Sequence, residues 1–262
     1  MMKFFSNIVN FFSPFDFKGN EQFNKIAELD GLQKASQFSL TNLNLQVVQQ
    51  GTINSTNPQL IISNHIGGLD IAIIKSLLSK NNYVISLYAS KKTLPKSFAD
   101  DILPVYFSGK PQKFNNIIDQ IFYSYCVSLE GNLSREEAMQ KNRQTIATAA
   151  ELISQGASVI IFPTGEMNEG GHWKPGVGHL LKQIRNPNAE IILTQIKGIT
   201  RVDEYRIFKP SLRRLFFKPK TVEVTFHTPL NISELALENQ DIPQIINRLE
   251  QEYCKIYPSE NS

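Results

Sequence analysis

The stretch from Leu60 to Leu78, LIISNHIGGLDIAIIKSLL, decides the fold because a strand, a polar loop and a helix follow one another in it. Leu60-Ile61-Ile62 is a short, β-branched apolar run, which predicts a buried strand. The apolar spacing of residues 71–78 predicts a helix. A strand that passes through a glycine-containing loop into a helix is typical of an α/β protein with a parallel sheet.

Strands and helices continue to alternate along the chain. We expect further strands at 43–47, 83–88, 159–162, 191–196 and 222–226, and helices at about 21–36, 134–155, 177–184 and 242–256. Ser134 and Glu137 have the spacing of a capping box at the start of the long helix, and Gly156 stands where that helix should stop. The predicted fold is α/β, a layered fold with a mostly parallel central sheet flanked by helices.

Residues 2–12 predict an amphipathic helix that ends before Pro14. Its apolar residues fall within one arc of about 160° at 100° per residue: Phe4, Phe5, Ile8, Val9, Phe11 and Phe12. This helix either lies in the plane of a membrane surface or docks on the domain, and both interpretations stay open. We expect an N-terminal helical segment at 1–38 and an α/β domain at 39–262.

Composition excludes several classes of protein. The 262 residues are 41% apolar and 19% charged, unlike a disordered chain or a coiled coil. No apolar run exceeds four residues, so we expect no transmembrane segment, and no secretory signal is visible. The two cysteines, Cys126 and Cys254, argue against a disulfide framework. We expect a cytoplasmic protein.

Positive charge is concentrated in one segment although the net charge is only +3. Residues 197–220 contain two acids and eight cations: Lys197, Arg201, Arg206, Lys209, Arg213, Arg214, Lys218 and Lys220. Such a patch favours an anionic partner, such as phosphate groups, an acidic carrier protein or a lipid surface, unless it is a solvated loop. It lacks an aromatic-interleaved motif, so we expect no nucleic-acid partner.

The loop Ser63–Asp70 contains a histidine and an aspartate. Gly67-Gly68 allows a tight turn, which would bring His65 and Asp70 together. A carboxylate on one imidazole nitrogen fixes the tautomer, and the other nitrogen then serves as a general base at neutral pH. The alternative is an ordinary loop histidine before a helix-capping aspartate.

A second loop, Phe162-Pro163-Thr164-Gly165-Glu166, follows the predicted strand at 159–162, and Trp173-Lys174-Pro175-Gly176 comes shortly after it. A Pro-x-Gly turn exposes backbone amides, which can bind anions or a developing oxyanion. The alternative is a simple strand–turn–helix connection. In open parallel sheets ligands bind beyond the carboxyl ends of the strands, and both loops are expected there.

In this order the two loops resemble the motifs of the lysophospholipid acyltransferase superfamily, the glycerolipid acyltransferases of the PlsC type. Asn64, His65 and Asp70 match its Asn-His-x4-Asp motif in full. Its third motif, Phe-Pro-Glu-Gly-Thr and then Phe-Lys-x-Gly, resembles residues 162–166 and 173–176. Residues 89–94 look like its lysine-containing segment, and the resemblance covers about residues 40–230.

The resemblance implies transfer of a fatty acyl group from acyl-CoA or acyl-carrier protein to a hydroxyl of a lysolipid or related acceptor. His65 would be the general base and Asp70 its orienting partner. The donor is a co-substrate, and no cofactor and no metal are expected. Partners would be the acyl donor, the lipid acceptor and the inner face of the membrane, with peripheral association. The implied substrate-binding residues are Asn64, Thr164, Gly165, Glu166 and Lys174.

The chain also departs from the family pattern. The second motif ends in an arginine that holds the acceptor's phosphate, and its best match, residues 126–131, has Gly131 there. Thr164 and Glu166 exchange the family's glutamate and threonine. With Glu130 and Glu166 near the acceptor, we expect a lysolipid without a terminal phosphate monoester.

Two other classes of function remain. A non-catalytic lipid-binding or scaffold protein could keep the fold after losing the arginine. A metal hydrolase would use Glu166, His172, His179 and Asp70. The turn at 173–176 breaks the helix that His172 and His179 would share, so the sequence disfavours the hydrolase.

Overall fold

The computed structural model describes residues 17–53, 56–79, 81–107, 117–131, 133–165, 172–207, 217–235 and 237–257. The predicted helix at 2–12 lies outside them. The chain forms two compact units made of separate stretches. Unit 1 comprises Met1–Gln50, Ile66–Ser79 and Ile196–Thr225, and unit 2 comprises Gly51–His65, Lys80–Gln195 and Phe226–Ser262. The chain therefore passes from one unit to the other inside the Asn-His-x4-Asp motif.

Unit 2 contains a parallel sheet whose strands have the order β6-β2-β5-β3-β4. Its strands are β2 (Gln59–Ser63), β3 (Asn82–Leu87), β4 (Ile102–Val105), β5 (Ser158–Ile161) and β6 (Glu190–Lys197). The short β8 (Leu230–Asn231) pairs antiparallel with β6. These pairings confirm the predicted mostly parallel sheet.

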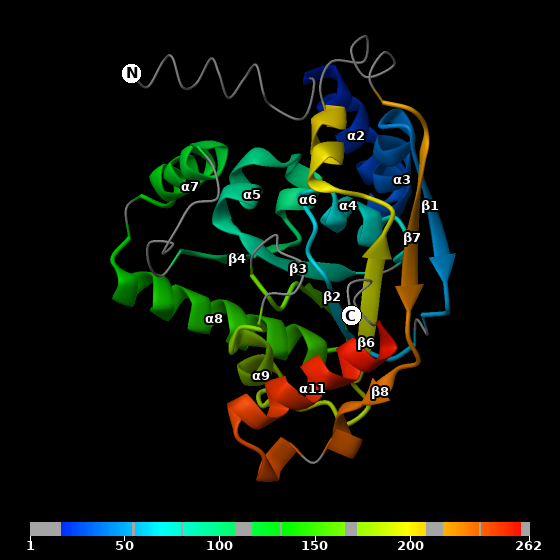
Figure 1. Ribbon diagram of the computed structural model, residues 1–262. Helices are drawn as coiled ribbons and strands as arrows, with labels where there is room; N and C mark the ends of the chain where they lie inside the picture. Colours follow the sequence, from blue (N-terminus) through cyan, green and yellow to red (C-terminus); the bar gives the residue numbers. More distant parts are fainter. Residues whose placement is uncertain are drawn as a thin grey trace. The chain divides into compact units, whose positions relative to one another are not determined.

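Helices cover this sheet, which explains why its central strands have apolar residues on both faces. All five residues of β2 are buried. In Figure 1, α8 (Arg135–Ser154), α9 (Gly176–Leu181) and α11 (Ile242–Ile256) lie below the strands. The helices α5 (Tyr88–Thr93), α6 (Lys96–Ala99) and α7 (Ile117–Glu130) lie above them. No described helix is long and apolar enough to cross a bilayer.

The ends of α8 follow the sequence prediction. The Ser134 hydroxyl accepts a hydrogen bond from Glu137 N (3.1 Å), and the Glu137 carboxylate accepts one from Ser134 N (2.8 Å). Gly156 after the helix has φ of 102°, a conformation that glycine adopts without strain. The capping box and the stop signal are therefore confirmed.

Other boundaries differ from the prediction. The single helix expected at 21–36 is wrong: α2 (Phe17–Asp30) and α3 (Leu32–Asn42) are separated by Gly31, whose φ is 87°. A left-handed residue cannot continue an α-helix, so the chain breaks there. The predicted domain boundary at 38–39 falls inside α3. Strand β4 was not predicted, because Pro104 interrupts its apolar pattern.

Unit 1 contains α2, α3, α4 (Asp70–Lys75), a short helix η1 (Arg201–Ile207) and two strands. The strands β1 (Leu45–Gln50) and β7 (Lys220–Phe226) run parallel, with Leu45 opposite Lys220. The helices bury their apolar faces: Phe23, Ala35 and Leu40 are at most 1% exposed. This burial accounts for the packing of unit 1.

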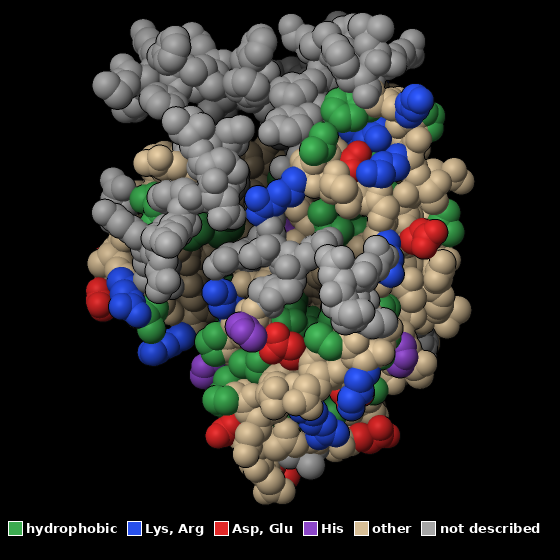
Figure 2. Space-filling view, viewed as in Figure 1, with side chains coloured by type: hydrophobic (Ala, Val, Ile, Leu, Met, Phe, Trp, Pro, Cys, Tyr) green, Lys and Arg blue, Asp and Glu red, His purple; other side chains and the backbone are tan. Residues whose placement is uncertain are grey.

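Asp203 organises the basic segment of unit 1. Its carboxylate binds Arg206 Nε and Lys220 Nζ, each at 2.7 Å, and accepts a bond from Thr200 N at 2.8 Å. Arg206 also donates to the carbonyl oxygens of Leu43 and Lys218. Two of the eight cations thus have a structural role. On the face seen in Figure 2, Lys and Arg side chains lie singly or in small groups among other side chains.

Burial alone would raise the pKa of Asp203, but hydrogen bonds from Lys220, Arg206 and Thr200 outweigh it and lower the pKa to about 2. An aspartate with a lowered pKa stabilises the fold above its unfolded value of 3.8, and this stability is lost as the pH falls towards 2. The linked free energy is about 2 kcal/mol.

Asp203→Asn should lower the free energy of unfolding at pH 7 by about 2 kcal/mol or more, since Arg206 then keeps a buried charge without its partner. The difference from the wild type should shrink between pH 4 and pH 2. Urea unfolding at several pH values measures both. Glu223→Gln on the exposed side of β7 is the matched control and should change little. A difference that does not vary with pH would contradict this account.

Candidate active site

His65 lies two residues beyond the end of β2, at the carboxyl edge of the sheet. Strands β2 and β5 are parallel neighbours with Ile62 opposite Ile161, so the chain leaves both strands at the same edge. The His65 ring stacks on Phe162, with 4.5 Å between ring centroids and 21° between ring planes. The two loops that the sequence singled out therefore meet within unit 2, through an aromatic contact.

Asp70 is the first residue of α4 and is completely buried. Its Oδ2 accepts hydrogen bonds from Ile66 N (2.6 Å) and Gly67 N (3.0 Å). The carboxylate thus turns back and holds the preceding loop. Asp70 does not cap the helix: Leu69 is the N-cap residue, and it makes no side-chain capping bond.

The turn after β5 brings three predicted site residues together. Gly165 N donates to Phe162 O at 3.1 Å, and Gly165 has φ of 64°, so the tight turn requires glycine's freedom. Lys174 N donates to Pro163 O at 2.8 Å. A Cβ built on Gly165 would lie 3.6 Å from Lys174 Cγ, which places the lysine stem beside the turn. Thr164 is buried in the same turn.

A family model described as Acyltransferase matches residues 44–196, more than half of the chain. The chain belongs to this acyltransferase family. The fold is also similar to the crystal structure of the 1-acyl-sn-glycerophosphate (LPA) acyltransferase PlsC from Thermotoga maritima. That similarity has a TM-score of 0.50 and 13% identity, and it covers 99% of this chain and 90% of the other.

At that identity the similarity to PlsC shows a shared fold. No curated protein sequence matches the chain. The family match and the shared fold together confirm the resemblance to the lysophospholipid acyltransferase superfamily.

Other predicted site residues of this acyltransferase have varied placements. Asn64 is half-buried next to His65, whereas Glu166 lies outside the described residues. Trp173 is 9% exposed and packs edge to face on Tyr253 with 5.7 Å between centroids, so it is a core residue. Its burial holds the segment that carries Lys174. The turn residues and Lys174 therefore depend on packing within unit 2.

The segment compared with the family's second motif forms the end of α7, and Gly131 follows the helix with φ of 78°. Glu130 is 8% exposed, and its Oε2 accepts a hydrogen bond from Phe107 N at 3.1 Å. Its Oε1 is buried and has no hydrogen-bond partner among the described residues. Glu130 thus belongs to the packing beyond β4. The expectation of an acceptor without a phosphate monoester then depends on Gly131 in place of the arginine and on Glu166.

Burial raises the pKa of Glu130, and the bond from Phe107 N lowers it by less. An acid with a raised pKa favours the folded state most when it is protonated. This contribution is lost as the pH rises above the unfolded value of 4.5 through the folded value.

Glu130→Gln should therefore raise the unfolding temperature at pH 8, because glutamine still accepts the bond from Phe107 N and carries no buried charge. At pH 4 the variant and the wild type should unfold at nearly the same temperature. Thermal unfolding at the two pH values is the measurement. Glu136→Gln, an exposed acid on α8, is the control. Destabilisation by Glu130→Gln at pH 8 would show that the carboxylate charge has a partner.

The histidines considered for a metal site are not clustered. His172 is fully exposed and lies 3.6 Å from Glu250 on α11. His179 is exposed on α9, which begins at Gly176 after the turn that separates the two histidines. Within the described ranges, no group of three His, Cys, Asp or Glu side chains is placed to hold a metal ion. The structure thus offers no observation in favour of the hydrolase.

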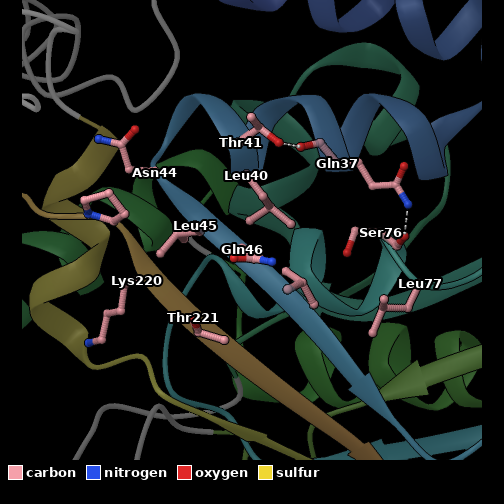
Figure 3. A pocket seen from close by; sticks show the side chains of 12 residues that line it. Gln37, Leu40, Thr41, Asn44, Leu45, Gln46, Ser76, Leu77, Lys220 and Thr221 are labelled. Atoms are coloured by element: carbon pink, nitrogen blue, oxygen red, sulfur yellow. Dashed lines mark hydrogen bonds between the residues drawn. The ribbon is translucent and has the colours of Figure 1, made fainter.

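A cavity of about 520 Å³ lies in unit 1, between α3, β1, the end of α4 and the start of β7 (Figure 3). Gln37 Nε2 donates to Ser76 O across it at 2.8 Å. Its side chains are neutral except Lys220, whose ammonium binds Asp203. None of the motif residues lines this cavity.

Proposed function

We propose that this acyltransferase moves a fatty acyl group from a thioester donor, acyl-CoA or acyl-carrier protein, to a hydroxyl of a lysolipid or related glycerolipid acceptor. The observation that carries the proposal is the stacking of His65 on Phe162 at the exit of two adjacent parallel strands. It supports the proposal because a general base at His65 would lie beside a turn that could bind an anion, and acyl transfer needs such an arrangement.

In the proposed reaction, His65 takes the proton of the acceptor hydroxyl while the oxygen attacks the thioester carbonyl carbon. The carbon–sulfur bond then breaks, and His65 gives the proton to the departing sulfur. The donor's carrier group therefore leaves as a thiol. Direct transfer requires no acyl-enzyme. A base positioned in this way contributes about 10²–10⁴ in rate.

Asp70 would have two roles. Oδ2 holds the loop through Ile66 N and Gly67 N. We propose that the Asp70 carboxylate also fixes the tautomer of the His65 imidazole and stabilises the imidazolium that forms. The loop and the base would then be held by the same side chain.

The turn at Pro163–Gly165 would supply polarity on the other side of the reacting carbonyl. Backbone amides in such a turn can stabilise an oxyanion. Lys174, whose stem lies beside Gly165, would meet an anionic group of donor or acceptor. Asn64, Thr164 and Glu166 are the further proposed acceptor contacts. All groups in this scheme belong to the protein or its two substrates.

The second candidate is a non-catalytic lipid-binding or scaffold protein. The glycine at position 131 and the exchanged Thr164 and Glu166 favour it. A binder has no need of a general base, whereas the transferase depends on one. Activity of His65 variants therefore separates the two functions.

His65→Ala should lower acyl transfer by about 10² or more while the protein stays folded, since a half-buried loop histidine adds little packing. Asp70→Asn should cause a similar loss, because its amide oxygen can keep the two loop bonds while the carboxylate charge is lost. Transfer of labelled acyl groups from acyl-CoA to a total lipid extract, followed by product identification, is the assay.

His179→Ala, which changes an exposed histidine on α9, is the matched control and should retain full activity. Near-full turnover by His65→Ala would refute the mechanism. A wild-type protein that binds lipids without transferring an acyl group would establish the second candidate.

We further propose peripheral contact with the inner face of the membrane. The phenylalanine face predicted at residues 2–12 would insert shallowly, and the basic segment would meet anionic head groups. Residues 197–220 carry eight cations and two acids, and Arg206 and Lys220 pair with Asp203. Each cation near an anionic surface contributes about 1 kcal/mol.

Co-sedimentation with anionic vesicles should decrease when salt is added, and decrease further when residues 1–14 are deleted. Screening weakens the electrostatic part, whereas deletion removes the apolar part. Vesicles of zwitterionic lipid are the control and should bind less protein. Binding that is unchanged by both salt and deletion would show that another surface is used.

A further inference from the structure

We propose that Phe162 is a positioning residue for His65: its ring fixes the plane of the imidazole and stabilises the imidazolium formed during transfer. The inference deepens the proposed function and rests on it. Its basis is the near-parallel stack, with ring centroids 4.5 Å apart and 21° between the planes.

Phe162 is itself held firmly, which it must be to orient another ring. It directly follows β5, whose residues Val159, Ile160 and Ile161 are at most 5% exposed, and its own exposure is 8%. Its carbonyl oxygen accepts the bond from Gly165 N, and the next carbonyl accepts the bond from Lys174 N. The backbone on both sides of Phe162 is therefore fixed, which limits the movement of its ring.

Stacking suits a general base because it uses the face of the imidazole and not its edge. The hydrogen bonds of Nδ1 and Nε2 lie in the ring plane, so a ring on the face does not compete with them. The negative face of the benzene ring also attracts a cation. Since the imidazole becomes cationic only after it takes the proton, this attraction favours the transition state over the ground state.

The test compares Phe162→Leu with Phe162→Tyr. Leucine fills part of the space but has no π face, whereas tyrosine keeps the ring. We expect Phe162→Leu to lower kcat about 5- to 20-fold with KM nearly unchanged, and Phe162→Tyr to stay within about twofold of the wild type. The matched control is Phe98→Leu on α6, a phenylalanine that is 3% exposed and belongs to no motif. It should lose stability but keep kcat per folded molecule.

A second measurement does not depend on turnover. Ring protons of His65, assigned by their loss in His65→Ala, should show an upfield ring-current shift in the NMR spectra of the wild type and Phe162→Tyr. Phe162→Leu should abolish this shift. Equal kcat in Phe162→Leu and the wild type, or an unshifted His65 signal in the wild type, would overturn the inference.

The two proposals can fail separately. If the His65 signal is shifted but His65→Ala transfers acyl groups normally, the proposed function is wrong, and Phe162 has no catalytic role to support. If His65→Ala is inactive and Phe162→Leu is fully active, the proposed function stands, and the positioning role of Phe162 is refuted.

Discussion

The parallel pairing of β2 with β5 is the constraint on which the candidate site depends. It aligns Ile62 with Ile161, so the next residues of both strands emerge side by side. His65 and Phe162 can stack only because the offset from the paired residues is short on each strand. The side chains in the interior of these strands are buried, and their close packing holds that register. Core packing thereby sets the geometry of a polar site.

Much of the fold could be predicted because the signals are local. The capping box at Ser134 and Glu137, the stop at Gly156 and the apolar runs of β2 and β5 each depend on a few neighbouring residues. The break at Gly31 was missed because nothing in the helical pattern around it requires φ > 0. Strand β4 was missed because its proline is tolerated only at a sheet edge, and edge position is a property of the whole sheet.

The site was predictable in part. The loops of His65 and Phe162 could be identified from the sequence, but Phe162 entered only as one residue of a motif, without a role of its own. Their ring contact depends on strand order, which periodicity does not reveal; the position of both residues shortly after a buried strand was the available hint. The sequence also placed Glu130 beside the acceptor, whereas the structure turns its carboxylate towards Phe107 N. Residues 126–131 were only the best local match to a motif, and local similarity could not show the surroundings of this helix end.

The burial of Asp70 bears on the choice between an enzyme and a binder. Its Oδ2 satisfies Ile66 N and Gly67 N, a task that an asparagine oxygen would also perform without a buried charge. Removing a carboxylate from water costs several kcal/mol unless hydrogen bonds or an opposite charge compensate for it. Under the proposed mechanism, the negative charge would stabilise the imidazolium of His65, a cation that forms only when His65 accepts a proton. In that scheme the buried carboxylate has a role in catalysis that lipid binding alone would not require.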